Sequence, residues 1–282
     1  MFISFLSDFG HEDEFVGVVH GVIARIAPEV RVIDVTHEVA PGDIRSGALA
    51  LLRAVQYVPQ GVMLAVVDPG VGTNRRAIAA NTPWGVFIGP DNGLLAPAVA
   101  MVGGAEQIYE ITNPELVLPA AGATFHGRDL FAPAAAVVAS GQATVDQLGE
   151  PVDPMTVTPL MVPLVEPDGN GGLIGEVLWI DRFGNVQTNV TPADLAGLGL
   201  EAGDDVVLRV GASEFRLAWV TTYGDVEPGE GLVHIDSYGQ IAVAVREGRA
   251  DESFPLATRV AVTMARPAGG KRIELQGVKP LD

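Results

Sequence analysis

The sequence contains no cysteine, and lysine occurs only twice, at Lys271 and Lys279. The absence of cysteine excludes disulfides, thiol nucleophiles, thiolate zinc sites and iron–sulfur clusters. Basic residues of any kind are scarce, since 17 arginines and lysines stand against 35 aspartates and glutamates, for a formal net charge of -18. A nucleic-acid-binding protein would be basic instead, so we expect no nucleic-acid partner.

Long apolar runs are missing as well. The longest candidates, such as residues 62–67, have the length of a strand and end at turn residues. The N-terminus has no basic segment and reaches Asp8 too early for a signal peptide. We therefore expect a cytoplasmic protein with no membrane partner. Because 48% of the 282 residues are hydrophobic and 18% are charged, the chain should fold around a sizeable core.

Strand and helix patterns alternate in the first half of the chain. Four short apolar runs indicate buried strands: 2–6, 31–35, 62–67 and 84–88. Segments with helical spacing lie between them, and an alanine-rich helix is expected at 128–140. This alternation predicts a parallel sheet covered by helices on both faces.

The second half has a different pattern, which begins near Thr156 with a stretch rich in proline and glycine. Seven strand-like segments follow: 173–180, 185–190, 205–210, 214–219, 232–235, 240–245 and 259–262. Such a series is typical of a small all-β barrel or sandwich. We predict an α/β fold class with an N-terminal parallel α/β sandwich domain at 1–160. A linker at 161–172 and a smaller C-terminal all-β barrel domain at 173–282 follow.

An acidic residue follows each predicted strand of the first domain or closes it: Asp8, Asp34, Asp68 and Asp91. In a parallel sheet these points lie along the carboxyl edge, where open α/β sheets bind ligands. A single such residue is usually part of a turn, but four in succession favour a site at this edge. Asp8, Asp13 and His37 offer an alternative metal site, yet their separation matches no ligand spacing, so we expect no metal.

Two segments of the first domain concentrate polar chemistry. VVDPGVGTNRR, residues 66–76, places Asp68 and Arg75 on one glycine-rich loop that lacks the Lys-Ser/Thr pair of a P-loop. TFHGRD places His126 before the predicted helix, where the dipole favours an anion or a neutral imidazole. Each segment also has an ordinary structural interpretation. In the loop, Asp68 and Arg75 could simply form an ion pair that closes a turn, and His126 could simply be hydrogen-bonded where the helix begins.

Two segments of the second domain carry similar polar turns. In IDRFGNVQTN, Phe183 and Asn185 flank a glycine, and an aromatic ring with a carboxamide suits a purine base. An ordinary β-turn is the alternative. In HIDSYGQ, Ser237 precedes Tyr238 on a comparable turn.

Seven stretches together resemble the S-adenosylmethionine (SAM) hydroxide adenosyltransferases, the adenosyl-forming SAM hydrolases related to fluorinases and chlorinases. In chain order they are SDFGHEDEFVG, DVTHEVAPGDI, VVDPGVGTNRR, GPDNGLL, TFHGRD, DRFGNVQTN and DSYGQ. They run from Ser7 to Gln240, so the resemblance covers almost the whole chain. It implies hydrolysis of SAM to adenosine and L-methionine with no cofactor. It also implies a homotrimer with SAM bound between the N-domain of one subunit and the C-domain of its neighbour.

The resemblance assigns roles by matching position. Asp68, Arg75 and His126 correspond to a water-activating trio. Asp8 resembles the carboxylate that holds the ribose hydroxyls. The residues that match the methionine- and adenine-binding segments are Asp181, Phe183, Asn185 and Ser237.

The halogenases differ from this chain at informative positions. They carry a tyrosine in place of Asp68, lack a counterpart of His126 and have a tryptophan in the segment of Gly42. The resemblance therefore implies water, not halide, as the nucleophile. Three alternatives stay open: a halogenase-like enzyme with another nucleophile, a non-catalytic SAM or adenosine sensor, and a metal-dependent phosphoesterase that uses Asp8 and the other edge carboxylates.

Overall fold

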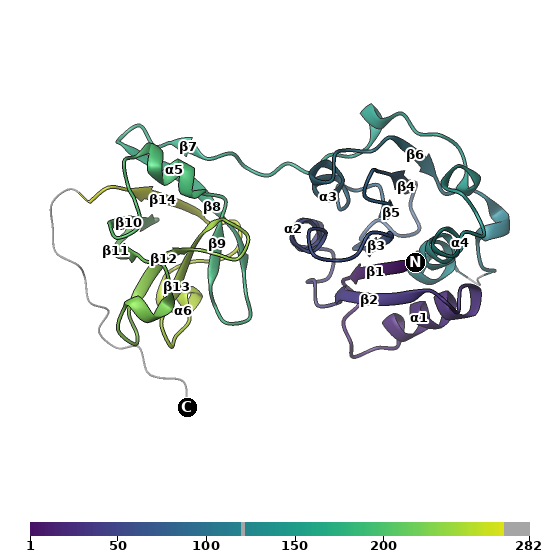
Figure 1. Ribbon diagram of the computed structural model, residues 1–282, viewed down its shortest axis with the longest axis horizontal. Helices are drawn as coiled ribbons and strands as arrows, with labels where there is room; N and C mark the ends of the chain where they lie inside the picture. Colours follow the sequence, from purple (N-terminus) through teal and green to yellow (C-terminus); the bar gives the residue numbers. More distant parts are fainter. Residues whose placement is uncertain (120–121, 268–282) are drawn as a thin grey trace. The chain divides into compact units, whose positions relative to one another are not determined.

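The computed structural model describes residues 1–119 and 122–267. The chain forms two compact units, Met1–Met161 and Val162–Asp282 (Figure 1). Within the described residues, no helix combines the length and the apolar composition needed to cross a membrane.

The N-terminal unit is built on a six-stranded sheet with the order β2-β1-β3-β5-β4-β6. Its strands are β1 (Phe2–Ser7), β2 (Arg31–Thr36), β3 (Val62–Val66), β4 (Ala77–Asn81), β5 (Val86–Pro90) and β6 (Gln107–Glu110). The first four in spatial order, β2, β1, β3 and β5, run parallel, whereas β4 is antiparallel to β5 and β6. The predicted parallel sheet is therefore present, and the antiparallel edge that β4 and β6 add to it was not predicted.

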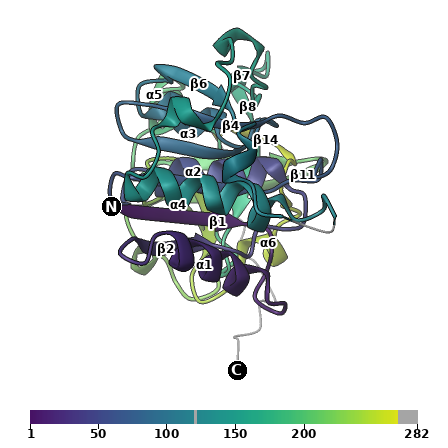
Figure 2. The same cartoon turned by 90° about the vertical axis from the view of Figure 1, so that its right-hand side faces the viewer.

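Helices cover both faces of this sheet. On one face, α1 (Phe15–Ile26) packs against α4 (Ala132–Ser140), and α4 contacts β1 and β3. On the other, α2 (Ile44–Ala54) packs against α3 (Ala96–Met101). Figure 2 shows α4 crossing in front of β1, with α2 and α3 behind the sheet. Because side chains alternate along β1, Phe5 enters the core under α1 and α4 while Leu6 enters the opposite core.

The C-terminal unit is a closed barrel. Its strands are β7 (Glu166–Pro167), β8 (Gly172–Ile180), β9 (Val186–Thr188), β10 (Asp205–Val210), β11 (Ser213–Trp219), β12 (Gly231–Ile235), β13 (Ile241–Val245) and β14 (Ala261–Ala265). They follow the order β14-β10-β11-β12-β13-β9-β8-β7, and β14 also pairs with β8, which closes the ring. Each of the seven predicted segments corresponds to one barrel strand. The structure thus confirms the predicted fold class and favours the barrel over the sandwich.

Short helical elements complete both units. The short helices of the barrel unit are α5 (Pro192–Gly197) and α6 (Ala250–Ser253). Single 3-10 turns occur at Pro114–Leu116, Val145–Leu148, Pro154–Thr156 and Tyr223–Asp225. The predicted helix at 128–140 begins with a π-helical turn, Gly127–Phe131, and becomes α-helical only at Ala132. His126 directly precedes this wider turn.

Candidate functional site

The loop after β3 is shaped by its own hydrogen bonds. Val71 N donates to Asp68 O at 3.2 Å, and Thr73 Oγ1 donates to Gly70 O at 2.7 Å. Gly72 has a φ of +78°, and a Cβ there would lie 3.2 Å from the carbonyl oxygen of Ala123. Only glycine fits this combination easily. The loop therefore turns tightly enough to bring its two ends together.

The two ends of the loop meet in a bidentate ion pair. Arg75 Nε donates to Asp68 Oδ1 at 3.0 Å, and Arg75 Nη2 donates to Asp68 Oδ2. The Asp68 and Arg75 side chains are only 5% and 8% exposed. The guanidinium carbon also lies 5.3 Å from the centre of the Phe131 ring. The remaining nitrogen, Nη1, is buried and has no hydrogen-bond partner among the described residues.

His126 is the third member of this group, which we call the trio. Its Nδ1 lies 3.1 Å from Arg75 Nη2. A guanidinium can only donate, so Nδ1 accepts and the neutral ring carries its proton on Nε2. Burial lowers the pKa of His126, and the positive charge of Arg75 lowers it further, against weaker opposing effects of Asp68 and Asp129. The ring is therefore neutral near pH 7.

Asp8 lies beside the trio. Its backbone N donates to Val66 O at 3.3 Å, and its Oδ2 accepts from Gly42 N at 2.8 Å. Burial raises the pKa of Asp8; the Gly42 hydrogen bond opposes this and the Asp68 carboxylate adds to it. The structure therefore brings Asp8, Asp68, Arg75 and His126, which the sequence analysis singled out, to one place at the carboxyl edge of the sheet.

Two other polar residues of this edge, Asp91 and Asn92, have structural roles. Asp91 pairs with Arg76 at 2.6 Å and accepts from Thr158 N at 2.7 Å. Asn92 donates to Val67 O at 2.8 Å and braces the end of β3. These contacts explain two of the polar positions without a ligand.

The alternative metal site of Asp8, Asp13 and His37 is not assembled. The described His, Asp and Glu side chains whose ligand atoms cluster within 4.8 Å are His20, Asp34 and His37. Asp8 and Asp13 do not belong to that group, and the Asp8 side chain accepts a hydrogen bond from the Gly42 amide instead.

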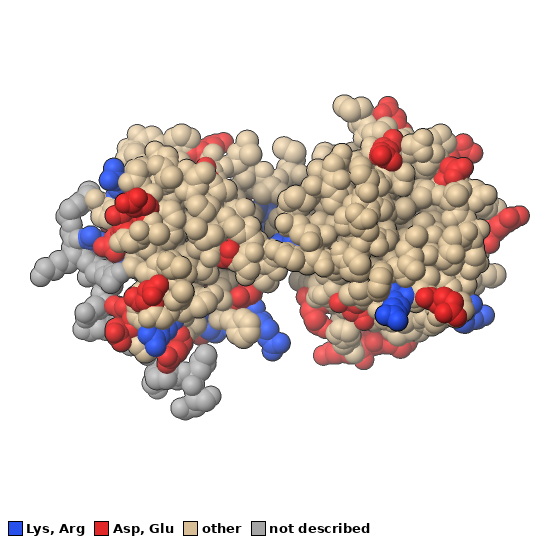
Figure 3. All heavy atoms as spheres, in the orientation of Figure 1, with Lys and Arg blue, Asp and Glu red and all other residues tan. Residues whose placement is uncertain are grey.

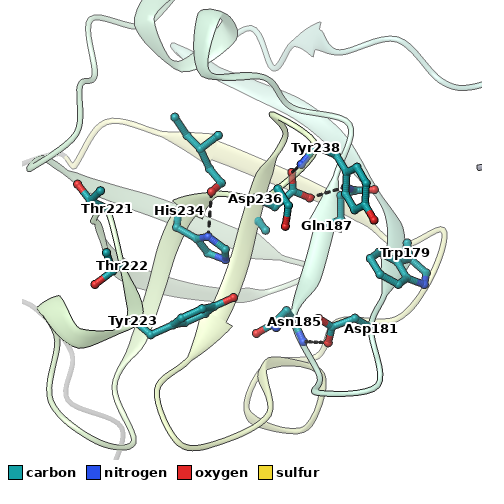
Figure 4. A pocket seen from close by; sticks show the side chains of 13 residues that line it. Trp179, Asp181, Asn185, Gln187, Thr221, Thr222, Tyr223, His234, Asp236 and Tyr238 are labelled. Atoms are coloured by element: carbon teal, nitrogen blue, oxygen red, sulfur yellow. Dashed lines mark hydrogen bonds between the residues drawn. The ribbon is translucent and has the colours of Figure 1, made fainter. Parts of the chain in front are cut away.

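Two neighbouring cavities of the barrel unit share Asp181, Asn185 and Tyr223. Figure 4 shows the first of them. Their volumes are about 450 and about 610 Å³, within the range of small-molecule sites. Ser237 lines the first cavity and Phe183 the second, where the Phe183 side chain is largely exposed. The four barrel residues singled out in the sequence analysis thus lie at these two cavities.

Two aspartates shape the turns at these cavities. Asp181 Oδ1 accepts from Phe183 N at 2.8 Å and Asn185 N at 2.9 Å, and Oδ2 accepts from Asn185 Nδ2 at 2.8 Å. Asp236 does the same for the turn of Ser237, with Oδ1 accepting from Tyr238 N at 2.8 Å. Both carboxylates therefore fix the side chains that surround the cavities.

His234 and Tyr223 are cavity residues that the sequence analysis did not select. His234 Nδ1 lies 3.1 Å from Ile235 O, so it donates and leaves Nε2 as an acceptor. Nε2 is buried with no partner in the described chain, and the ring centre lies 5.0 Å from that of Tyr223, with the two ring planes tilted by 59°. Burial lowers the pKa of His234 and keeps the ring neutral. In the sequence, His234 lies in a segment that predicts only the strand β12, so nothing there indicates a cavity.

Comparison with known proteins places the chain among relatives. Residues 3–149 match the family model described as SAM hydroxide adenosyltransferase N-terminal domain, and residues 175–263 match the corresponding C-terminal domain. An (R)-S-adenosyl-L-methionine hydrolase of Salinispora tropica is 51% identical over 88% of this chain and 91% of that protein. A fluorinase of an Actinoplanes species is 27% identical over 94% of this chain and 97% of that protein.

A solved structure agrees with this placement. An uncharacterized conserved protein from Thermotoga maritima superposes with a TM-score of 0.86 at 37% identity, covering 94% of this chain and all of that one. The similarity therefore extends over both units.

Proposed function

The chain belongs to the SAM hydroxide adenosyltransferase family, and from this premise we propose that it hydrolyses S-adenosyl-L-methionine to adenosine and L-methionine. The observation that carries the proposal is the unpartnered Nη1 of Arg75, a buried donor beside a neutral histidine and a carboxylate. A water molecule bound there would satisfy this donor.

The reaction is a displacement at the ribose C5′ carbon. A water oxygen forms a bond to C5′ while the C5′–S bond breaks. The electron pair of the C5′–S bond goes to the sulfur and neutralises the sulfonium. Methionine leaves as a neutral thioether, so the sulfur needs no acid. The attacking water loses one proton, which ends in solvent. The enzyme must chiefly hold the water in line with the breaking bond and stabilise the charge that develops on it.

The trio divides these tasks. Arg75 Nη1 donates to the water and lowers its pKa by its positive charge. His126 orients the water through Nε2–H, because Nδ1 is occupied by Arg75. Asp68 holds the guanidinium in place and offers a carboxylate toward which the proton can move. No step requires a metal or an organic cofactor, and SAM is the only small-molecule partner in the proposal.

Substrate holding is assigned to the remaining predicted residues. Asp8 binds the ribose hydroxyls, and the residues of the barrel cavities that hold the adenine and methionine ends are Asp181, Phe183, Asn185 and Ser237. Asp8 and Asp181 also accept backbone hydrogen bonds that stabilise the surrounding loops. The sulfonium of SAM is a cation, which suits aromatic rings and carboxylates.

The product decides between this function and its alternatives. The purified protein is incubated with SAM and an excess of chloride or fluoride, and nucleosides are separated by chromatography. Equal amounts of adenosine and methionine are expected. A 5′-halogenated nucleoside would instead indicate a halogenase-like enzyme. Bound but unchanged SAM would indicate a sensor. Activity lost to a chelator and restored by a metal would favour the phosphoesterase class.

The proposal includes a cytoplasmic homotrimer with SAM bound at the subunit interface, as the resemblance implies. An Asp68→Ala variant and an Asn185→Ala variant are refolded together and assayed. If each site combines residues from two subunits, the mixture regains part of the activity that each variant lacks. Unchanged inactivity of a mixed oligomer would argue for sites within one subunit.

A further inference from the structure

Two histidines and an aspartate form a cluster between α1 and β2, outside the trio. His20 lies in α1, Asp34 in β2, and His37 directly follows β2. Their potential ligand atoms all lie within 4.8 Å of one another. We propose that this cluster is a binding site for a divalent transition-metal ion of the zinc type. The site is independent of the proposed SAM chemistry.

The distances fit a metal site after a small adjustment. Asp34 Oδ1 lies 2.8 Å from His20 Nε2 and 3.0 Å from His37 Nε2. Donor atoms at about 2.0–2.2 Å from a tetrahedral ion are separated by roughly 3.3–3.6 Å. Asp34 Oδ1 and each of the two histidine nitrogens would therefore move apart by less than about 1 Å to admit the ion. Both imidazoles already direct Nε2 to the same carboxylate oxygen.

His37 is held in the orientation that a ligand needs. Its Nδ1 lies 2.7 Å from Ser7 Oγ, and both residues are almost fully buried. Ligating histidines commonly donate their other ring N–H to a neighbouring acceptor, and Ser7 Oγ can serve as that acceptor. In the metal-free chain Nε2–H donates to Asp34 Oδ1, so binding of the ion would move the ring proton to Nδ1 and leave the Nε2 lone pair for the metal. The Phe5 ring fixes the geometry further, at 4.6 Å from the His37 ring and 6.2 Å from the His20 ring.

The donor set selects the class of ion. Two imidazoles and one carboxylate suit zinc and its neighbours, whereas magnesium and calcium prefer oxygen donors alone. The His20 and Asp34 side chains are 35% and 41% exposed, so an ion can enter from solvent and a water molecule can complete its coordination. Figure 3 shows acidic side chains along the lower margin of the N-terminal unit, where α1 and β2 lie in Figure 1. Their field attracts cations.

Such an ion would tie a helix to the sheet. His20 is the contribution of α1, and the other two ligands come from β2 and the residues after it. Binding to the folded chain alone raises the free energy of unfolding, so the ion should raise the melting temperature. The predicted absence of metal rested on the spacing of Asp8, Asp13 and His37; His20 and Asp34 were not considered as ligands.

The test is metal binding by the full-length protein after chelator treatment and dialysis. Zinc is titrated by calorimetry, and cobalt serves as a spectroscopic probe of coordination. We expect one ion per chain, a cobalt spectrum of low coordination number, a higher melting temperature, and no response to magnesium or calcium. No zinc binding, or binding without the cobalt signature, would overturn the proposal.

Variants locate the site. His20→Ala and Asp34→Asn change partly exposed side chains, so the fold should persist, and each should weaken zinc binding by about 100-fold or more. His11→Ala is the matched control, because its ring lies 5.3 Å from that of His37 but is outside the cluster. It should bind zinc as the parent does. Equal affinity in His20→Ala and the parent, or an equal loss in His11→Ala, would contradict the assignment.

Discussion

Arg75 fixes the tautomer of His126, because its Nη2 nitrogen lies 3.1 Å from His126 Nδ1 and can only donate a hydrogen bond. The same nitrogen also donates to Asp68. The histidine therefore faces its surroundings with an N–H and not with a lone pair. This distinguishes a histidine that orients water from one that removes its proton.

Two amide substitutions of His126 separate these roles. Glutamine places an N–H near the position of Nε2, whereas asparagine mimics only Nδ1. We expect His126→Gln to retain SAM hydrolysis within about tenfold of the parent and His126→Asn to lose about 100-fold in kcat. Adenosine release measured by chromatography gives both rates. Equal losses in the two variants would contradict the orienting role, and melting temperatures establish that both are folded.

The buried ion pair should matter for stability. Arg75→Met leaves the 5% exposed Asp68 side chain without its partner, which should lower the free energy of unfolding by about 3–5 kcal/mol. Adding Asp68→Asn should restore part of the loss, because the unpaired charge is removed. Glu38→Gln, in the exposed pair with His11, is the control and should change stability by less than about 0.5 kcal/mol. Urea unfolding measures all of them; a loss in Arg75→Met no larger than in the control would refute the argument.

The pKa of His126 lies below its ordinary value of 6.5, first because of burial and then because of Arg75. Hydrolysis should therefore be independent of pH near neutrality and fall only below 6.5. Between the two pKa values the unfolded ring binds a proton that the folded ring does not. The contribution of His126 to stability is thus fully present above pH 6.5 and is lost as the pH falls from there through the lower pKa of the folded state.

Ring-proton NMR gives this pKa directly. Arg75→Met should raise the pKa of His126, because a positive charge is removed, and Asp68→Asn should lower it. Shifts of the same sign in both variants would be inconsistent with this electrostatic account.

His234 offers a neutral acceptor to whatever fills the first barrel cavity. His234→Phe keeps an aromatic ring in contact with Tyr223 but removes Nε2, and we expect roughly tenfold weaker binding of SAM. His234→Gln supplies an amide oxygen instead and should bind more tightly than the phenylalanine variant. Calorimetry with adenosine and methionine separately shows which end of SAM uses the cavity. Unchanged affinity for SAM, adenosine and methionine in His234→Phe would exclude a ligand contact.

Local patterns predicted most of the fold. The runs that form β1 and β3 are apolar because both faces of the sheet are buried, and that signal is visible in a few consecutive residues. β4 was missed because its sequence, Ala77–Asn81, is mostly alanine, and its conformation depends on pairing with β5 and β6. Closure of the barrel was equally hidden, since it requires β14 to meet β8.

The site shows the same limit. Asp68 and Arg75 are seven residues apart on one loop, so their pairing could be predicted from the sequence. His126 is 51 residues from Arg75, and only the resemblance to a known family joined it to them. His234 had no such support, because its burial and its unpartnered nitrogen arise from tertiary packing. The His20–Asp34–His37 cluster likewise depends on the contact of α1 with β2.

The central claim is that water attacks the ribose C5′ of SAM. Its most direct test is a reaction in water enriched in the heavy isotope of oxygen, followed by mass spectrometry of both products. The account predicts adenosine that carries one heavy atom at the 5′-hydroxyl, and unlabelled methionine. Labelled methionine with unlabelled adenosine, or SAM that is never consumed, would contradict it.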